Sequence, residues 1–307
     1  MHELIVTVMY HAGVHLLFAS AVGGAAWLLT SLRGASATTK YWIWVVTAFN
    51  FVVPSGALID KLWAPHLTWA RPLGAIGDSV SKMTEGRIAL ALGVIWLAAA
   101  LSLFLRLMSR IRRECRPTPS GRGDREGAGH FMADGIPVAF AEEHPSPAVR
   151  GVLYPRIVLP TGLDRLLTQR EFHAVLIHEL AHARRRDNLI RLLYEASLCV
   201  LWFHPLVWLA GRRMALYREL SCDESVIRRA HGQALVSALA KLAVPEQVGF
   251  LQATAASHMS YRLACLAGPA ETTSTVNLVV TSLFAAVIAT GIFQTVAHTA
   301  CCFWTKH

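Results

Sequence analysis

Two histidines and a glutamate in the run His178-Glu179-Leu180-Ala181-His182 are the residues best suited to chemistry. Residues four apart lie on one face of a helix, so both imidazoles can bind the same metal ion. Glu179 can then reach a water on that metal and act as the general base of a hydrolase. The rest of the stretch is almost entirely apolar, and the alternative is that these polar groups pair only with neighbours. The spacing predicts a catalytic zinc site.

A third zinc ligand is expected from the downstream segment Tyr217–Glu224, in which Glu219 and Asp223 share one helical face. Glu219 is predicted to bind the metal, and Asp223 to accept the free N–H of a ligand histidine. Glu224 and Cys222 compete as ligands on chemical grounds. In the alternative, Glu219 and Asp223 pair with nearby arginines on a solvated face, namely Arg212, Arg213 and Arg218.

Several other residues are left open by their positions alone. His204 is either a ligand or a structural histidine bonded to backbone. Asp187 pairs with Arg184 or Arg191, or it supports the zinc site. Arg184 to Arg186 are expected at the membrane surface near anionic lipid, with docking of an acidic substrate as the alternative. Cys301 and Cys302 are expected to pair between chains or to be modified.

The helix that must carry the histidines has a clear start. Thr168 and Glu171 form the Thr-x-x-Glu pattern of a capping box, so a helix should begin there and run through His182. Two short strands are predicted before it, at Ile136–Ala141 and Val152–Leu159. Because Pro155 and Pro160 lack a backbone donor, the second strand is expected at a sheet edge.

Composition places this helix in a membrane protein. The chain of 307 residues is 54% hydrophobic and only 16% charged, whereas soluble domains carry nearer a quarter charged residues. Four apolar segments approach the ~20 residues needed to cross a bilayer, at 11–32, 41–59, 88–108 and 276–297. The fold class expected is a mainly α integral membrane protein with four transmembrane helices and a small α+β zinc domain. A shorter apolar run, 198–210, is either a core helix or a re-entrant segment.

The charge distribution sets the orientation and excludes one class of partner. The formal net charge is +9, but the basic residues flank the apolar segments and form no stripe with aromatics, so direct nucleic-acid binding is not expected. The positive-inside rule predicts both termini outside, including a tail at 298–307. A basic linker at 109–129 and the zinc domain at 130–275 would be cytosolic. The six cysteines show no disulfide or metal-knuckle spacing.

Three stretches together resemble a known family. HELAHARRRDNL, WFHPLVW and RELSCDE are similar to the BlaR1/MecR1-type integral membrane metallopeptidases, peptidase family M56. The resemblance implies a zincin-like fold in a bacterial inner membrane, with Zn²⁺ at His178, His182 and Glu219. It further implies Glu179 as base and Asp223 as a partner of the ligands. The substrate implied is a cytosolic regulator such as a transcriptional repressor, or the chain itself, and the strand in GVLYPRIVLP could pair with it.

The resemblance has one departure. The best-known members continue into an extracellular penicillin-binding sensor domain, whereas this sequence ends at His307. Sensing would then fall to a separate sensor protein, to a homo-oligomer or to the loop at 60–87. The rival class is a non-enzymatic signalling or scaffold protein whose structural metal has a fourth ligand, such as Cys222 or His204.

Overall fold

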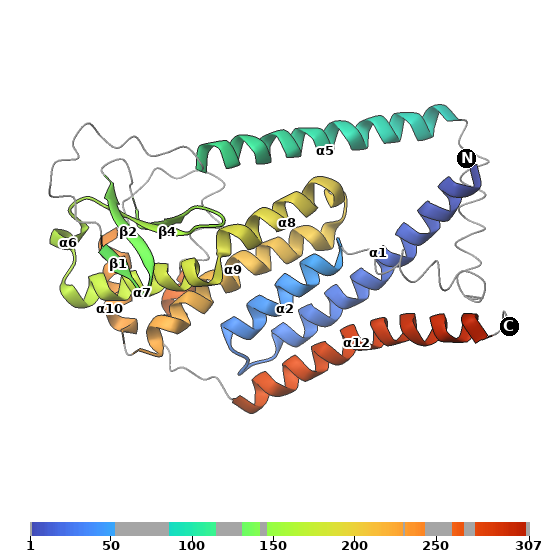
Figure 1. The fold of residues 1–307 in the computed structure, drawn as a ribbon. Coiled ribbons are helices and arrows are strands. Elements are labelled where there is room, and N and C mark those ends of the chain that lie inside the picture. Colours follow the sequence, from blue (N-terminus) through green and yellow to red (C-terminus); the bar gives the residue numbers. More distant parts are fainter. Residues whose placement is uncertain are drawn as a thin grey trace.

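The structure, a computed structural model, describes residues 2–52, 86–114, 131–141, 146–229, 231–242, 260–266 and 274–304. Within these residues the fold is mainly helical with one four-stranded sheet. Figure 1 shows long helices at one end of the molecule and the sheet with shorter helices at the other. Both labelled termini lie at the end away from the sheet. The predicted combination of a mainly α chain and a small α+β part is confirmed at this level.

Four long helices correspond to the predicted spans: α1 (His2–Ser31), α2 (Ala37–Asn50), α5 (Gly86–Glu114) and α12 (Ser274–Trp304). Among the described helices, Ala91–Arg112 in α5 is the one stretch long and apolar enough to cross a membrane. Shorter apolar stretches occur at His15–Ser31 and Ser274–Ala289. A four-span arrangement therefore stays a prediction.

The ends of these helices differ from the predicted segments. α2 ends at Asn50, and 53–59 of the second predicted span lie outside the described residues. α5 continues through 109–114, the predicted start of the linker, because this stretch is rich in Arg and ends in Glu, which favour helix. α12 continues to Trp304 through most of the predicted tail, where no Gly or Pro stops it. The remaining linker at 115–129 and the loop at 60–85 lie outside the described residues.

The apolar run at 198–210 is the corner of a helical hairpin rather than one helix. α8 (Asp187–Leu201) ends there, a turn follows, and α9 (Pro205–Ile227) begins with proline at its first position. The two helices pack closely: a Cβ at Gly211 would lie 2.0 Å from the Tyr194 hydroxyl. The hairpin tip lies beside the long helices, since Trp96 of α5 donates to the Val200 carbonyl at 3.2 Å.

A first hydrophobic core lies among α1, α2, α9 and α12 (Figure 1). α2 contributes its buried face, and the Trp44 indole donates to the Thr30 hydroxyl of α1 at 3.2 Å. At its start, Ser36 caps α2 and its amide donates to the Asn277 side chain of α12 at 2.6 Å. α2 is thus fixed to the long helices on both sides.

The sheet has the order β1-β2-β4-β3, formed by Phe131–Ala133, Ile136–Ala141, Arg156–Pro160 and Ala148–Arg150 respectively. β1 and β2 are antiparallel, joined by Asp134 and Gly135, which both have positive φ as a tight hairpin turn requires. β2 and β4 are parallel, and β3 and β4 antiparallel. The prediction of β2 at Ile136–Ala141 is confirmed.

The second predicted strand differs in extent and place. Its first residues, 152–154, form a bend and not a strand. The bend requires glycine at position 151, where φ is +87° and a Cβ would lie 2.3 Å from the Tyr154 carbonyl oxygen. The edge prediction was wrong, because β4 lies between β2 and β3. Pro160 is tolerated as the last strand residue, and the next amide, that of Thr161, donates to Ala141.

Helix α7 (Gln169–Arg185) carries the histidine motif and starts with the predicted capping box. The Thr168 amide donates to Glu171 at 2.8 Å, and such caps contribute about 1 kcal/mol. Glu171 also accepts from Lys241 of α10 (Gly232–Leu242), and this bond, followed by that from Ser237, lowers the Glu171 pKa to about 2. A short helix, α6 (Leu163–Leu166), precedes α7. A second hydrophobic core lies between the sheet, α7 and α10.

A single residue joins α7 to α8. Arg186 has a left-handed backbone with φ of 55°, and it is both the C-cap of α7 and the N-cap of α8. Asp187 is therefore the first residue of α8. This corner fixes the direction in which α8 leaves the motif helix.

Candidate metal centre

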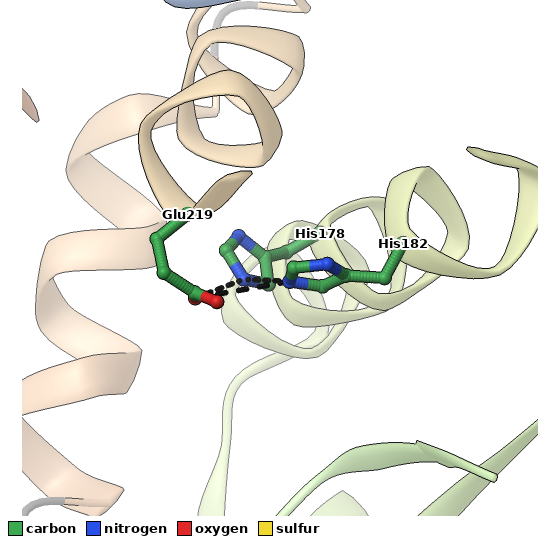
Figure 2. A group of neighbouring side chains, drawn as sticks. All are labelled: His178, His182 and Glu219. Atoms are coloured by element: carbon green, nitrogen blue, oxygen red, sulfur yellow. Dashed lines mark hydrogen bonds and ion pairs between the residues drawn. The ribbon is translucent and has the colours of Figure 1, made fainter. Parts of the chain in front are cut away.

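The side chains of His178, His182 and Glu219 converge from two helices (Figure 2). The two Nε2 atoms of α7 are 3.2 Å apart, and Oε2 of Glu219 in α9 is 3.7 Å from each. Zinc–nitrogen bonds of about 2.0–2.1 Å give ligand separations of about 3.3 Å in a tetrahedron. The donor types and spacing of these three residues therefore fit one zinc ion.

The other nitrogen of each ring faces a carboxylate. Nδ1 of His182 lies 2.6 Å from Oδ2 of Asp187. Nδ1 of His178 lies 3.1 Å from Oδ1 of Asp223, within ion-pair distance although its N–H is not aligned for a hydrogen bond. Carboxylates in these positions hold the ring orientation and leave Nε2 for a metal. Asp223 thus lies where the sequence placed it, and Asp187 supports His182 in the same way.

Arginines surround these carboxylates. Arg262 donates twice to Asp223, at 2.8 Å each, and its third nitrogen lies 3.5 Å from Glu219. Arg218 donates to the second oxygen of Glu219. Arg218 was among the arginines predicted as partners of these carboxylates, whereas Arg262 was not, because it lies 39 residues beyond Asp223 and carries no local signal.

Two of the arginines after the motif are paired with carboxylates. Arg185 is nearly buried, and it donates to both oxygens of Asp187 at 2.6 Å. Arg184 pairs with Asp134 in the β1–β2 turn. Each of these two guanidinium groups therefore has a carboxylate partner, and the location of Arg184 to Arg186 at a membrane surface stays a prediction.

A cavity of about 450 Å³ opens onto the cluster. Glu179 lines it beside both histidines, as the role of a base requires. One wall is apolar and comes from a single face of α10, with Leu235, Leu239 and Leu242. Other lining residues come from β3, and Arg218 and Arg262 of the site also line it. A peptide in this cavity would meet an apolar surface and a charged one.

The competing ligands lie elsewhere. Glu224 turns to α2 and accepts from the amide and hydroxyl of Thr38 at 3.2 and 3.1 Å. The Cys222 sulfur lies near the ligand atoms of His182 and Asp187 and is not part of the cluster with His178 and Glu219. A guanidinium nitrogen of Arg185 lies 3.2 Å from this sulfur.

His204 has no part in the cluster. His204 precedes the first residue of α9, about 20 Å along the helix from Glu219, and its ring contacts Ser20 and Phe51 rather than backbone. This position excludes it as a fourth ligand. The side chains of Cys301 and Cys302 lie outside the described residues.

Without metal, both histidines hold their protons tightly. Burial lowers the His178 pKa, but the nearby carboxylates of Asp223 and Glu219 outweigh it and raise the pKa to about 9. For His182, burial is likewise outweighed by Asp187 and Cys222, and the pKa lies well above its ordinary value. These protonated rings stabilise the metal-free fold below the ordinary pKa of 6.5, and for His178 that contribution is lost as pH rises through about 9.

Zinc affinity should therefore rise with pH. Each proton that zinc displaces from a ring makes the affinity increase about tenfold per pH unit while that ring is protonated in the free protein. Competition titrations against a chelating dye between about pH 6 and pH 8, corrected for the dye's own protonation, measure this slope. A flat profile would contradict the assignment of these histidines as ligands.

The sequence that forms this site matches a known protein family. The model of the family described as BlaR1 peptidase M56 matches residues 15–266, which include all of the cluster. The chain belongs to this family. Family membership supports a metallopeptidase-type enzyme, and the possible metal-binding group at His178, His182 and Glu219 agrees with it.

Relatives in the family are regulatory proteins. The chain is 37% identical over 83 residues to the regulatory protein BlaR1 of Bacillus licheniformis, which covers 27% of this chain and 14% of that protein. It is 26% identical over 98 residues to the methicillin resistance mecR1 proteins of Staphylococcus aureus and Staphylococcus epidermidis. This alignment covers 32% of this chain and 17% of each of those proteins. These similarities support a peptidase role in signalling. The aligned segments are only a small part of the relatives' length.

Proposed function

We propose that this chain is a zinc endopeptidase of the bacterial inner membrane that cleaves a cytosolic regulatory protein, such as a transcriptional repressor, or itself. The observation that carries this proposal is the convergence of His178, His182 and Glu219 beside Glu179 in one cavity. Both termini would lie outside the cell and the zinc domain in the cytosol. The placement of the two termini away from the sheet agrees with this orientation (Figure 1).

The mechanism assigns one task to each residue. Zinc, when held by the two histidines and Glu219, would polarise a peptide carbonyl and lower the pKa of a water molecule. Glu179 accepts the proton of the attacking water on its carboxylate and delivers it to the nitrogen of the leaving amine. Asp187 and Asp223 hold the histidine rings so that Nε2 faces the cavity.

A substrate strand cannot pair with β4, the strand within GVLYPRIVLP, because both edges of β4 are already paired with β2 and β3. β3 borders the cavity, but its outer edge is partly occupied: the Asn188 side chain donates to the carbonyls of Val149 and Gly151. The apolar face of α10 offers a second surface for a substrate side chain. Its partly exposed leucines, Leu239 and Leu242, favour an apolar residue near the cleaved bond.

The proposal is tested with the full chain reconstituted in lipid nanodiscs and incubated with a bacterial cytosolic proteome. New N-termini are labelled and identified by mass spectrometry. We expect a small set of cleavages, in a regulator or in the chain itself, that o-phenanthroline abolishes and added zinc restores. A scaffold protein with a structural metal would yield no new termini that depend on the metal, and that result would contradict the proposal.

A further inference from the structure

Helix α2 reaches the candidate metal centre through a tyrosine. Tyr41 is 1% exposed, and its hydroxyl donates to Oδ1 of Asp187 at 3.1 Å. The other oxygen of the same carboxylate lies 2.6 Å from Nδ1 of His182. Two consecutive contacts therefore connect α2 to the ring of a predicted zinc ligand.

Tyr41 also contacts the second group that holds Asp187. The guanidinium carbon of Arg185 lies 4.3 Å from the centre of the Tyr41 ring, within cation–π distance. Arg185 itself donates to both oxygens of Asp187. The tyrosine therefore acts on the carboxylate directly through its hydroxyl and indirectly through the arginine that its ring supports.

A second route joins the same two helices. Arg185 donates to the Ser221 hydroxyl at 2.7 Å, and this hydroxyl lies 2.8 Å from that of Thr38. Thr38 and Tyr41 are three residues apart and so lie on one face of α2. This face, at the start of the helix, is turned toward α9 and the site.

α2 also packs against α9 in the first hydrophobic core, and it contacts the long helices α1 and α12. Trp44 bonds to α1, and the residue that caps α2, Ser36, bonds to α12. A shift or rotation of α2 relative to α7 would lengthen the bond from Tyr41 to Asp187, and hydrogen bonds of this kind are lost beyond about 3.5 Å. α2 therefore provides one connection between the bundle of long helices and the His182 ring, separate from the contacts of α5 with α8.

We propose that Tyr41 is a positioning residue of the metal centre, through which α2 and the long helices set the orientation of the His182 ring. The inference rests on the proposed function, because it takes His182 as a zinc ligand. A purely structural tyrosine would need only some partner for its buried hydroxyl. Here the partner is the carboxylate that orients a ligand, and the ring supports that carboxylate's other donor.

The test is Tyr41→Phe in the full-length protein in detergent, with zinc affinity and the visible spectrum of the cobalt(II)-substituted protein as readouts. Loss of the direct partner of a ligand, here Asp187, typically lowers metal affinity about 10- to 100-fold. Tyr41 is one contact further from the metal, so we expect a smaller decrease, of up to about 10-fold, and a shifted cobalt spectrum. The matched control is Tyr194→Phe, which removes a hydroxyl bonded to the Val207 carbonyl within the α8–α9 hairpin. It should leave the affinity and the spectrum unchanged.

A double-mutant cycle with Asp187→Ala identifies the route. If Tyr41 acts through Asp187, then Tyr41→Phe should change zinc affinity little once Asp187 is removed. Wild-type affinity and spectrum in Tyr41→Phe, or fully additive effects in the cycle, would overturn the inference while the wild-type zinc site stands. Failure of the wild type to bind zinc would overturn both proposals, whereas zinc binding that depends on Tyr41 in a protein without cleavage activity would contradict only the peptidase function.

Discussion

Glu179→Gln is expected to slow peptide cleavage by about 100- to 10 000-fold, the usual contribution of a general base. Glutamine has the same shape but cannot take a proton from water at neutral pH. Glu179 lines the cavity without belonging to the three-residue ligand cluster, so the variant should still bind zinc. Single-turnover rates on a substrate found in the proteome experiment measure the first effect, and atomic absorption measures the second.

The paired measurements separate the roles that Glu179 could have. Lost activity with full zinc content supports a base. Lost zinc would instead make Glu179 a ligand or a structural requirement of the site. Cleavage at the wild-type rate would exclude Glu179 from the chemistry and would contradict the proposed mechanism.

Glu219→Gln is expected to lower zinc affinity by more than about 100-fold. Loss of a residue that only hydrogen-bonds to a ligand lowers metal affinity by at most about 100-fold, and loss of a ligand should cost more. The change removes the one anionic ligand of the cluster and leaves two imidazoles. It also removes a group that raises the pKa of both histidines, so protons compete less with zinc in the variant. This second effect opposes the first but is smaller, because Asp187 and Asp223 remain. Equilibrium titration against a chelating dye measures the net change.

A matched control is Glu195→Gln in α8. Glu195 also pairs with two arginines, Arg110 and Arg191, but it is not part of the ligand cluster. Its replacement should leave zinc affinity close to that of the wild type. Unchanged affinity in Glu219→Gln would show that the third ligand is another residue, and the same titration of Glu224→Gln and Cys222→Ser would then identify it.

The local features of the site could be predicted because they depend on helix periodicity. The capping box at Thr168 and Glu171 fixed the start of α7, and the spacing of four residues placed His178 and His182 on one face. The same periodicity placed Glu219 and Asp223 on one face of α9. The structure brings these residues together, although their roles stay predictions until metal binding is measured.

The contacts that periodicity does not encode were missed. Arg262 and Tyr41 lie 39 and 146 residues from the carboxylates they bind, and no local pattern connects such positions. The interior place of β4 depends on pairing with β3, a strand of three residues that is too short to give a signal of its own. The helix break inside 198–210 was overlooked because apolar residues continue across the turn, although a residue before proline, His204, marked it.

The one-residue corner at Arg186 constrains the chain length between the motif and its partner. Because no loop separates α7 from α8, the position of Asp187 relative to His182 follows from the backbone of a single left-handed residue. An additional residue in α8 before the carboxylate would rotate it by about 100° around the helix and move it away from the ring. The number of residues between His182 and Asp187 is therefore set by the geometry of the site, whatever the side chain of Arg186 itself.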